Sequence, residues 1–113
     1  MKAKLFYKNK KIEIDNITKC SLWRKFRGLM FTDKTTNPLL FEFKNARRRA
    51  IHSLFVSYPF LAIWLEKNKI LEYKIISPNN FSIVSKKPFT KLIEVPLNNK
   101  NIPIFNFFND ANL

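Results

Sequence analysis

Two apolar segments flank a short polar turn in FLAIWLEKNKILEYKII, residues 60–76. The first segment, residues 60–65, carries no charged side chain and has the length of a buried strand. Asn68-Lys69 is typical of a two-residue hairpin turn. Residues 70–76 continue as a second strand, which ends before Pro78. The stretch therefore predicts a hairpin in the central part of a sheet.

Shorter strands are predicted on both sides of this hairpin. Residues 2–8 and 11–15 alternate around Asn9-Lys10, which predicts a further hairpin. Other strands are predicted at residues 39–43, 51–56, 81–84, 91–95 and 102–105. Pro103 limits the last of these to a sheet edge or a strand end. The expected fold class is mainly β, a β-sandwich or partly closed barrel of short antiparallel strands.

Residues 21–29 are the segment with clear helical spacing. Leu22, Phe26 and Leu29 recur at i, i+4 and i+7, so they would share one face of a short amphipathic helix. Gly28 is the single glycine of the chain, and it suits the left-handed position at a helix end. The opposite face of this helix would carry the cations Arg24, Lys25 and Arg27.

The composition limits the class of protein. The chain has 113 residues, of which 46% are hydrophobic, and this predicts one domain over residues 1–113 with a buried core. A single glycine excludes the glycine-rich phosphate loops of dinucleotide-binding and P-loop enzymes. The single cysteine and the lack of an apolar leader predict a cytoplasmic protein. Residues 50–65 lack formal charges but are shorter than the roughly 20 residues of a membrane helix, so no membrane span is expected.

Four short motifs follow one another along the chain. They are RGLM at residues 27–30, PLLFEF at 38–43, IHSLF at 51–55 with Pro59 after it, and KLIEVP at 91–96. In sequence and order they resemble motifs of the family catalogued as domain of unknown function 192, in the form seen in archaeal members. The resemblance covers roughly residues 14–113. It implies a mainly β, sandwich-like fold with a short helix, and it implies no activity.

The chain departs from that family pattern at three places, and one of them is residues 98–101, which stand where family members tend to carry a Gly-Asp pair near the last strand. Leu61 stands where family members carry an aspartate two residues after the proline, and Val56 stands where they carry a methionine. If these two residues belong to a family site, that site is altered in this chain.

Two side chains have the chemistry to support catalysis. His52, the single histidine, titrates near neutral pH and would serve as a general base. Cys20 precedes a cationic predicted helix, where a thiolate is favoured. No motif links either residue to a partner, so both are interpreted as structural. The acids do not gather along the sequence, and Glu94 is interpreted as an outward strand residue. No catalytic residue, metal site or cofactor is therefore assigned.

Basic residues form the clearest functional pattern. The chain has Lys+Arg 21 against Asp+Glu 8, a net charge of +13, and every arginine lies between Lys19 and Arg49. A guanidinium group binds two phosphate oxygens at once, which a lysine does not. The residues assigned to anion binding are Arg24, Lys25, Arg27, Arg47, Arg48 and Arg49. Trp23 is the aromatic residue near them that could stack on a base. Lys86 and Lys87, distant in sequence, are expected to contribute less.

Three functions are compatible with these features. The favoured one is a non-enzymatic binding module whose basic surface holds a polyanion, RNA or DNA, by its backbone phosphates. The second is a small-molecule pocket on the concave, phenylalanine-lined face of the sandwich, with His52 and Tyr58 at its mouth. The third is a minimal enzyme that uses His52 or Cys20. The sequence does not determine the ligand or the oligomeric state.

Overall fold

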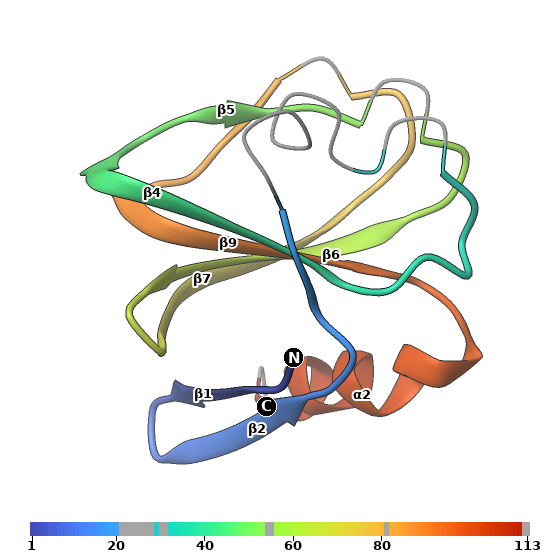
Figure 1. The fold of residues 1–113 in the computed structure, drawn as a ribbon, viewed down its shortest axis with the longest axis horizontal. Coiled ribbons are helices and arrows are strands. Elements are labelled where there is room, and N and C mark those ends of the chain that lie inside the picture. The colour runs from blue at the N-terminus through green and yellow to red at the C-terminus, as the bar shows by residue number, and fades with distance from the viewer. Residues whose placement is uncertain (21–28, 30–31, 54–55, 81, 112–113) are drawn as a thin grey trace.

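The computed structural model describes residues 1–20, 29, 32–53, 56–80 and 82–111. Its elements form a curled sheet with a helix and a hairpin below it (Figure 1). The strands are β1 (Ala3–Tyr7), β2 (Lys10–Ile14), β3 (Thr18–Lys19), β4 (Leu39–Arg47), β5 (Ala50–Ile51), β6 (Phe60–Glu66), β7 (Lys69–Ile76), β8 (Ile83–Val84) and β9 (Phe89–Pro96). A 3-10 turn, η1 (Asn99–Asn101), and the helix α2 (Ile102–Ala111) follow them.

One curled sheet contains most of these strands, in the order β2-β1-β7-β6-β9-β4-β3, and β5 pairs with β8 in a separate ribbon. Neighbouring strands are antiparallel, except that β1 runs parallel to β7 and β3 parallel to β4 over very short contacts. The prediction of a mainly β fold, a sandwich or partly closed barrel, is confirmed. The two parallel contacts were not predicted, because they join segments that are separate in the sequence.

β6 lies at the centre of the sheet, as the sequence predicts. Every residue from Phe60 to Leu65 is buried, and β7 and β9 flank this strand with long antiparallel ladders. Its side chains alternate between two faces: Leu61 and Ile63 belong to one core cluster, and Phe60, Ala62 and Trp64 belong to another. A strand that is apolar on both faces needs a cover on each side.

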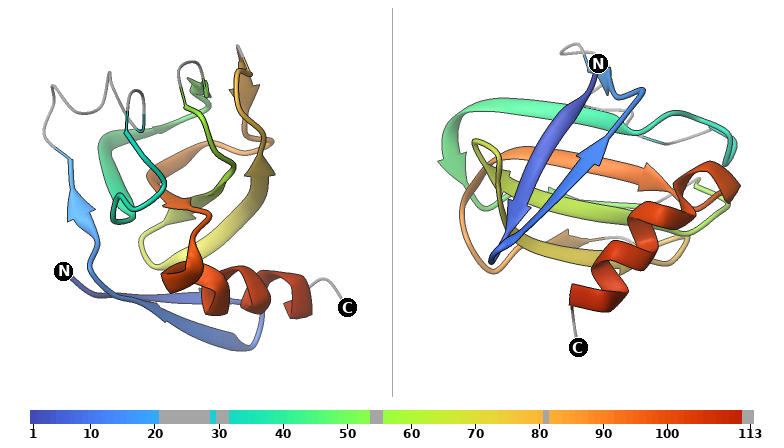
Figure 2. Two further views of the ribbon diagram at one scale, coloured as in Figure 1. Left: turned by 90° about the vertical axis from the view of Figure 1, so that its right-hand side faces the viewer. Right: turned by 90° about the horizontal axis from the view of Figure 1, so that it is seen from below.

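The two faces of the sheet have different covers. On the first face, the β1–β2 hairpin and α2 lie side by side (Figure 2), and Leu5, Ile14 and Phe108 pack with Leu61 and Ile63 in what we call the first core. On the second face, the cover comes from the β5–β8 ribbon, through Ile51 and Ile83, and from the loops before β4 and before β6. The described loop residues Cys20, Leu29, Val56 and Tyr58 pack with Trp64 and Phe60 in the second core.

Both hairpin turns begin one residue earlier than predicted. Tyr7 pairs with Lys10 and Glu66 pairs with Lys69, so the turn residues are Lys8-Asn9 and Lys67-Asn68. Lys8 and Lys67 take left-handed φ angles of 54° and 55°. The pairing register places the apolar side chains of both strands on the core face, and this register fixes which residues form the turn. It overrides the preference of asparagine for the first turn position.

The strand predicted over residues 51–56 is wrong for its described part, because β5 ends at Ile51. The buried residue Ser53 is bonded to the loop after β7 instead. Its hydroxyl donates to the carbonyl of Ser77 at 2.7 Å and accepts from the N–H of Asn80 at 2.7 Å. Its carbonyl accepts from the N–H of Asn79 at 2.9 Å. These bonds replace the strand ladder at this position.

The strand predicted over residues 102–105 is also wrong, since these residues begin α2. Pro103 stands in the first helical turn, where its missing N–H removes no helical hydrogen bond. Ile104, Phe105 and Phe108 are buried, and this spacing places them on one face of the helix against the first core. The helix predicted over residues 21–29 lies outside the described residues except for Leu29, which is buried.

Replacing Phe108 by alanine tests the contact between α2 and the sheet. The ring is 3% exposed, so Phe108→Ala should lower the free energy of unfolding by about 3 to 5 kcal/mol. The neighbouring Asn106 is exposed, and Asn106→Ala is the matched control, expected to change stability little. Urea denaturation followed by circular dichroism measures both. Equal midpoints for the two variants would contradict this assignment of the helix face.

Candidate functional site

Cationic side chains from separate segments meet at one end of the curled sheet. The pairs Tyr7–Lys10, Glu66–Lys69 and Arg47–Phe89 all lie there. In Figure 1 the β1–β2 turn, the β6–β7 turn and the connection from β4 to β5 are on the same side of the molecule. We call this region the basic end. Its exposed cations are Lys8, Lys10, Lys44, Arg47, Arg48, Lys67, Lys69, Lys86 and Lys87.

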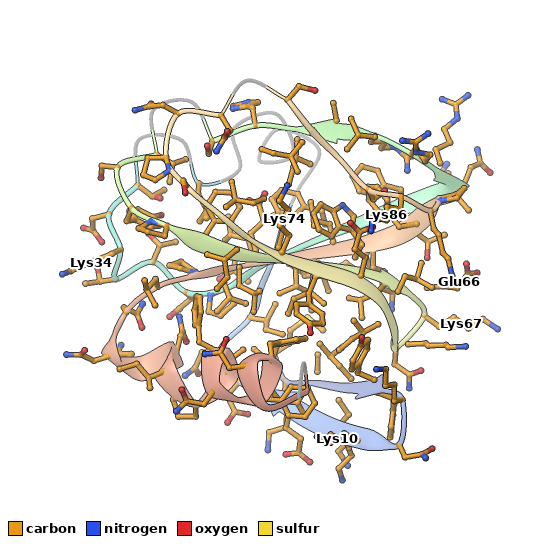
Figure 3. The ribbon with its side chains drawn as sticks, turned by 180° about the vertical axis from the view of Figure 1, so that it is seen from behind. Lys10, Lys34, Glu66, Lys67, Lys74 and Lys86 are labelled. Carbon is orange, nitrogen blue, oxygen red and sulfur yellow. The ribbon has the colours of Figure 1, made fainter. Side chains whose placement is uncertain are left out.

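Glu66 and Glu72 are the acids found among the described residues of the basic end. Glu66 is exposed beside Lys67, as Figure 3 shows, and Lys86 lies on the same side of the view. One carboxylate oxygen of Glu72 already has a partner, because its Oε1 accepts a hydrogen bond of 2.7 Å from the backbone N–H of Lys86. The excess of cations makes the basic end a region of positive potential, which attracts anions from a distance.

The three consecutive arginines have different environments. Arg47 is exposed at the end of β4. Arg48 is also exposed, but its Nε donates to the carbonyl of Ser85 at 2.8 Å. This contact joins the β4–β5 connection to the loop before β9. The structure therefore leaves Arg47 and the outer part of Arg48 for an anion.

Arg49 is half-buried and has a structural role. The central carbon of its guanidinium lies 4.1 Å from the ring centroid of Phe43 and 5.7 Å from that of Phe89. It also donates to the carbonyl of Asn45 at 3.1 Å. Burial, and secondly the charge of Arg47, lowers the pKa of Arg49. Arg49 thus fastens the β4–β5 connection onto β9 by cation–π contacts.

Lys86 and Lys87 lie next to the arginine run, although they are far from it in sequence. The Arg48–Ser85 hydrogen bond places the residues after Ser85 beside Arg48, and the hydroxyl of Ser85 donates to the carbonyl of Lys87 at 2.7 Å. The expectation that these lysines contribute less than the arginines depended on sequence distance. In the folded chain these lysines lie close to the arginines in space, so we include both lysines in the candidate site.

Part of the predicted anion-binding set cannot be placed. Arg24, Lys25 and Arg27, together with Trp23, lie outside the described residues. Their contribution to anion binding stays a prediction. The basic end defined above does not depend on them.

Aromatic side chains accompany the cations at the basic end. Phe6 is 40% exposed, and its register partners are Lys11 in β2 and Lys69 in β7. Tyr7 is half-buried and carries the Nζ of Lys8 at 5.3 Å from its ring centroid. Phe6 was not predicted as a site residue, although its position next to the inward-facing Leu5 in an alternating strand indicates an outward side chain. An exposed ring with a lysine on each side has the chemistry to stack on an unpaired base, and Lys11 Nζ also lies 3.9 Å from Oε1 of Glu13.

Two of the residues predicted for a pocket or for catalysis, Tyr58 and Cys20, belong to the second core. Tyr58 is buried in the second core, and its hydroxyl is hydrogen-bonded to that of Thr32. His52 follows β5 and is half-buried. Cys20 is buried, as expected for a structural cysteine, and its thiol lies 3.8 Å from the carbonyl of Thr18. Leu61, at the position of the family aspartate, is buried in the first core.

Glu94 is buried, and the prediction that it points outward is wrong. Its register partners in β4 and β6 are Leu39 and Ala62, which both belong to the second core. Glu94 is 5% exposed, and burial raises the pKa of its carboxyl to about 8. Glu94 is buried because the face of the sheet that it shares with Leu39 and Ala62 is covered by the second core, which its neighbours in sequence do not reveal.

Trp64 places a second polar group on the same face of the sheet. It is fully buried, and its indole N–H has no hydrogen-bond acceptor among the described residues. Ala62 is the register partner of Glu94, and Trp64 is two residues further along β6. Trp64 and Glu94 are therefore diagonal neighbours on one face of the sheet, with their Cα atoms roughly 7–8 Å apart. The second core therefore contains two polar groups whose burial is unfavourable.

Neither a cluster of metal-binding side chains nor a helix able to cross a membrane occurs among the described residues. Among them, no three His, Cys, Asp or Glu side chains lie close enough together to hold a metal ion. No helix in the described part is long and apolar enough to cross a membrane.

The fold resembles two solved structures. One is a Sinorhizobium meliloti protein provisionally described as a transcription regulator, with a TM-score of 0.72 and 15% sequence identity over 84% of this chain and 78% of that one. The other is a protein of unknown function from Novosphingobium aromaticivorans, with a TM-score of 0.66 and 10% identity over 90% of this chain and 75% of that one. At these identities the likeness concerns the fold alone. No family model and no curated protein matches the chain.

The burial of Glu94 predicts a dependence of stability on pH. Its pKa is about 8 in the folded chain against an ordinary 4.5, so unfolding releases a proton between these values, and stability falls as the pH rises from 4.5 to 8. Glu94→Gln removes this titration. The variant should match the wild type at pH 5 and be more stable by several kcal/mol, at most about 5, at pH 8.5.

Urea denaturation of both proteins at the two pH values measures the difference. Glu13→Gln, on an exposed side chain, is the matched control and should show no such change. An equal pH dependence of wild type and Glu94→Gln would contradict the raised pKa of this buried carboxyl.

Proposed function

We propose that the protein binds single-stranded nucleic acid at the basic end, chiefly through backbone phosphates. The observation that carries the proposal is the meeting of Arg47, Arg48, Lys86 and Lys87 with the lysines of both hairpin turns at one end of the sheet. Phosphate oxygens are the ligands that such a group of exposed guanidinium and ammonium groups favours. The likeness to a provisionally described transcription regulator agrees with this function.

The exposed ring of Phe6 favours a single strand over a duplex. In a duplex the base faces are stacked on one another, whereas an unpaired base can lie on an aromatic side chain. Phe6 has a lysine on each side in the sheet register, so a base on the ring would place its flanking phosphates near Lys11 and Lys69. In this proposal the protein binds nucleic acid without catalysing a reaction, and it acts in the cytoplasm.

We also propose that the chain is a divergent member of the family catalogued as domain of unknown function 192. Support comes from the placement of two of the motifs, since PLLFEF contributes to β4 and KLIEVP to β9, which are adjacent central strands. This membership adds no activity to the proposed binding function.

Removing Lys86 and Lys87 tests the phosphate contacts. Fluorescence anisotropy with a labelled oligothymidylate gives the affinity over a salt series. The logarithm of affinity should fall linearly with the logarithm of salt concentration, and Lys86→Ala/Lys87→Ala should flatten the slope by about 0.7 for each phosphate contact removed. Lys2→Ala/Lys4→Ala removes the same charge away from the basic end and should keep the wild-type slope. Equal slopes for the two variants, or no binding at low salt, would contradict the proposal.

Removing the ring of Phe6 tests the stacking contact separately. Phe6→Ala should weaken binding to the single strand about 5- to 100-fold without changing the salt slope, because the ring contributes no charge. Binding to a duplex of the same length should change less than twofold. Ile75→Ala, on an exposed side chain in the other half of β7, is the control and should bind like the wild type. An equal loss for single strand and duplex would indicate that Phe6 does not stack on a base.

A further inference from the structure

The opposite end of the sheet carries an open groove of about 730 Å³. It lies where β6 begins and β9 ends, so the whole sheet separates it from the basic end. Figure 3 shows this separation, with Lys34 on one side of the molecule and Lys67 and Lys86 on the other. The volume is within the range of small-molecule sites.

The floor of the groove is apolar, and its rim is cationic. Leu97 and Ile102 contribute large side chains that are 38% and 44% exposed, and Pro59 lies with them. Lys34 and Lys100 line the same groove from different segments. An apolar floor with cations at the rim fits a ligand that has an apolar body and an anionic group.

The walls of the groove are held together by hydrogen bonds between the segments. The side-chain amide of Asn98 donates to the carbonyl of Lys34 at 2.6 Å, and the N–H of Leu97 donates to the carbonyl of Pro59 at 3.1 Å. The hydroxyls of Thr32 and Tyr58 are also bonded to each other. The groove is therefore formed in advance of binding, which lowers the ordering cost for a ligand.

The acids near the groove have other partners. None of the described lining residues is acidic. Asp33, next to Lys34, accepts hydrogen bonds from the backbone and the hydroxyl of Thr35. Glu13 and Asp15 line the neighbouring hollow that shares Lys100, and both lie within ion-pair distance of Lys2. The rim of the groove therefore keeps a net positive charge.

We propose that this groove binds an amphipathic organic anion, a carboxylate with an alkyl or aryl body. The apolar body lies on Leu97, Ile102 and Pro59, and the carboxylate lies near Lys34 and Lys100. The site is independent of the proposed nucleic-acid interface, because none of its residues belongs to the basic end.

Binding of a fluorescent probe tests the apolar floor of the groove. The probe is 8-anilinonaphthalene-1-sulfonate, an aryl anion that becomes fluorescent in apolar sites. Ile102→Asp should weaken its binding at least tenfold, since the new charge repels the sulfonate and removes apolar surface. Val84→Asp is the matched control, because Val84 has the same 44% exposure and does not line the groove. It should bind the probe within twofold of the wild type. Leu97→Ser provides a second variant of the floor if Ile102→Asp fails to fold.

Competition by alkyl carboxylates tests the rim. Decanoate should displace the probe better than hexanoate, by up to about fourfold in affinity for each added methylene. The affinity of decanoate, measured by displacement of the probe, should be at least tenfold lower for Lys34→Ala/Lys100→Ala than for Lys86→Ala/Lys87→Ala. Three results would overturn the proposal. Decanol would compete as well as decanoate, or Ile102→Asp and Val84→Asp would lose probe affinity equally. The third result is that, of these variants, Lys86→Ala/Lys87→Ala alone loses probe binding. The last result would locate anion binding at the basic end.

Discussion

The burial of β6 on both faces is the constraint on which the rest of the structure depends. Residues Phe60 to Leu65 have no polar side chain that could face water, so each face of the sheet must be covered by other parts of the chain. The hairpin and α2 cover the first face, and the loops before β4 and β6 contribute to the cover of the second. This requirement explains why a small sheet carries two separate cores in place of one.

Coverage of both faces also determines where the charge lies. Lysine and arginine side chains cannot enter either core, so those near the ends of the central strands gather where the strands turn. At one end, the turns and the β4–β5 connection bring together cations that no short segment contains. At the other end, Leu97 and Ile102 are left exposed in a groove that Lys34 and Lys100 also line. The two ends therefore differ in chemistry: one is a group of exposed cations, and the other combines exposed apolar side chains with two lysines.

Glu94 and Trp64 are the exception to this separation of polar and apolar groups. Both belong to the second core, and the described residues supply neither an ion pair for the carboxyl nor an acceptor for the indole N–H. Such groups lower the stability of a fold, so the surrounding apolar contacts must offset them. At neutral pH, keeping the Glu94 carboxyl protonated limits this loss of stability.

The sequence by itself determined the mainly β class, the central strand at residues 60–65, the existence of both hairpins and the excess of positive charge. These features depend on composition and on periodicity along the chain, which act locally. Tertiary structure decided the turn positions, the helical state of residues 102–105, the burial of Glu94 and the meeting of Lys86 with Arg48. Each of these depends on which strand or helix lies alongside, because pairing register and burial are properties of two segments together and are not present in either one alone.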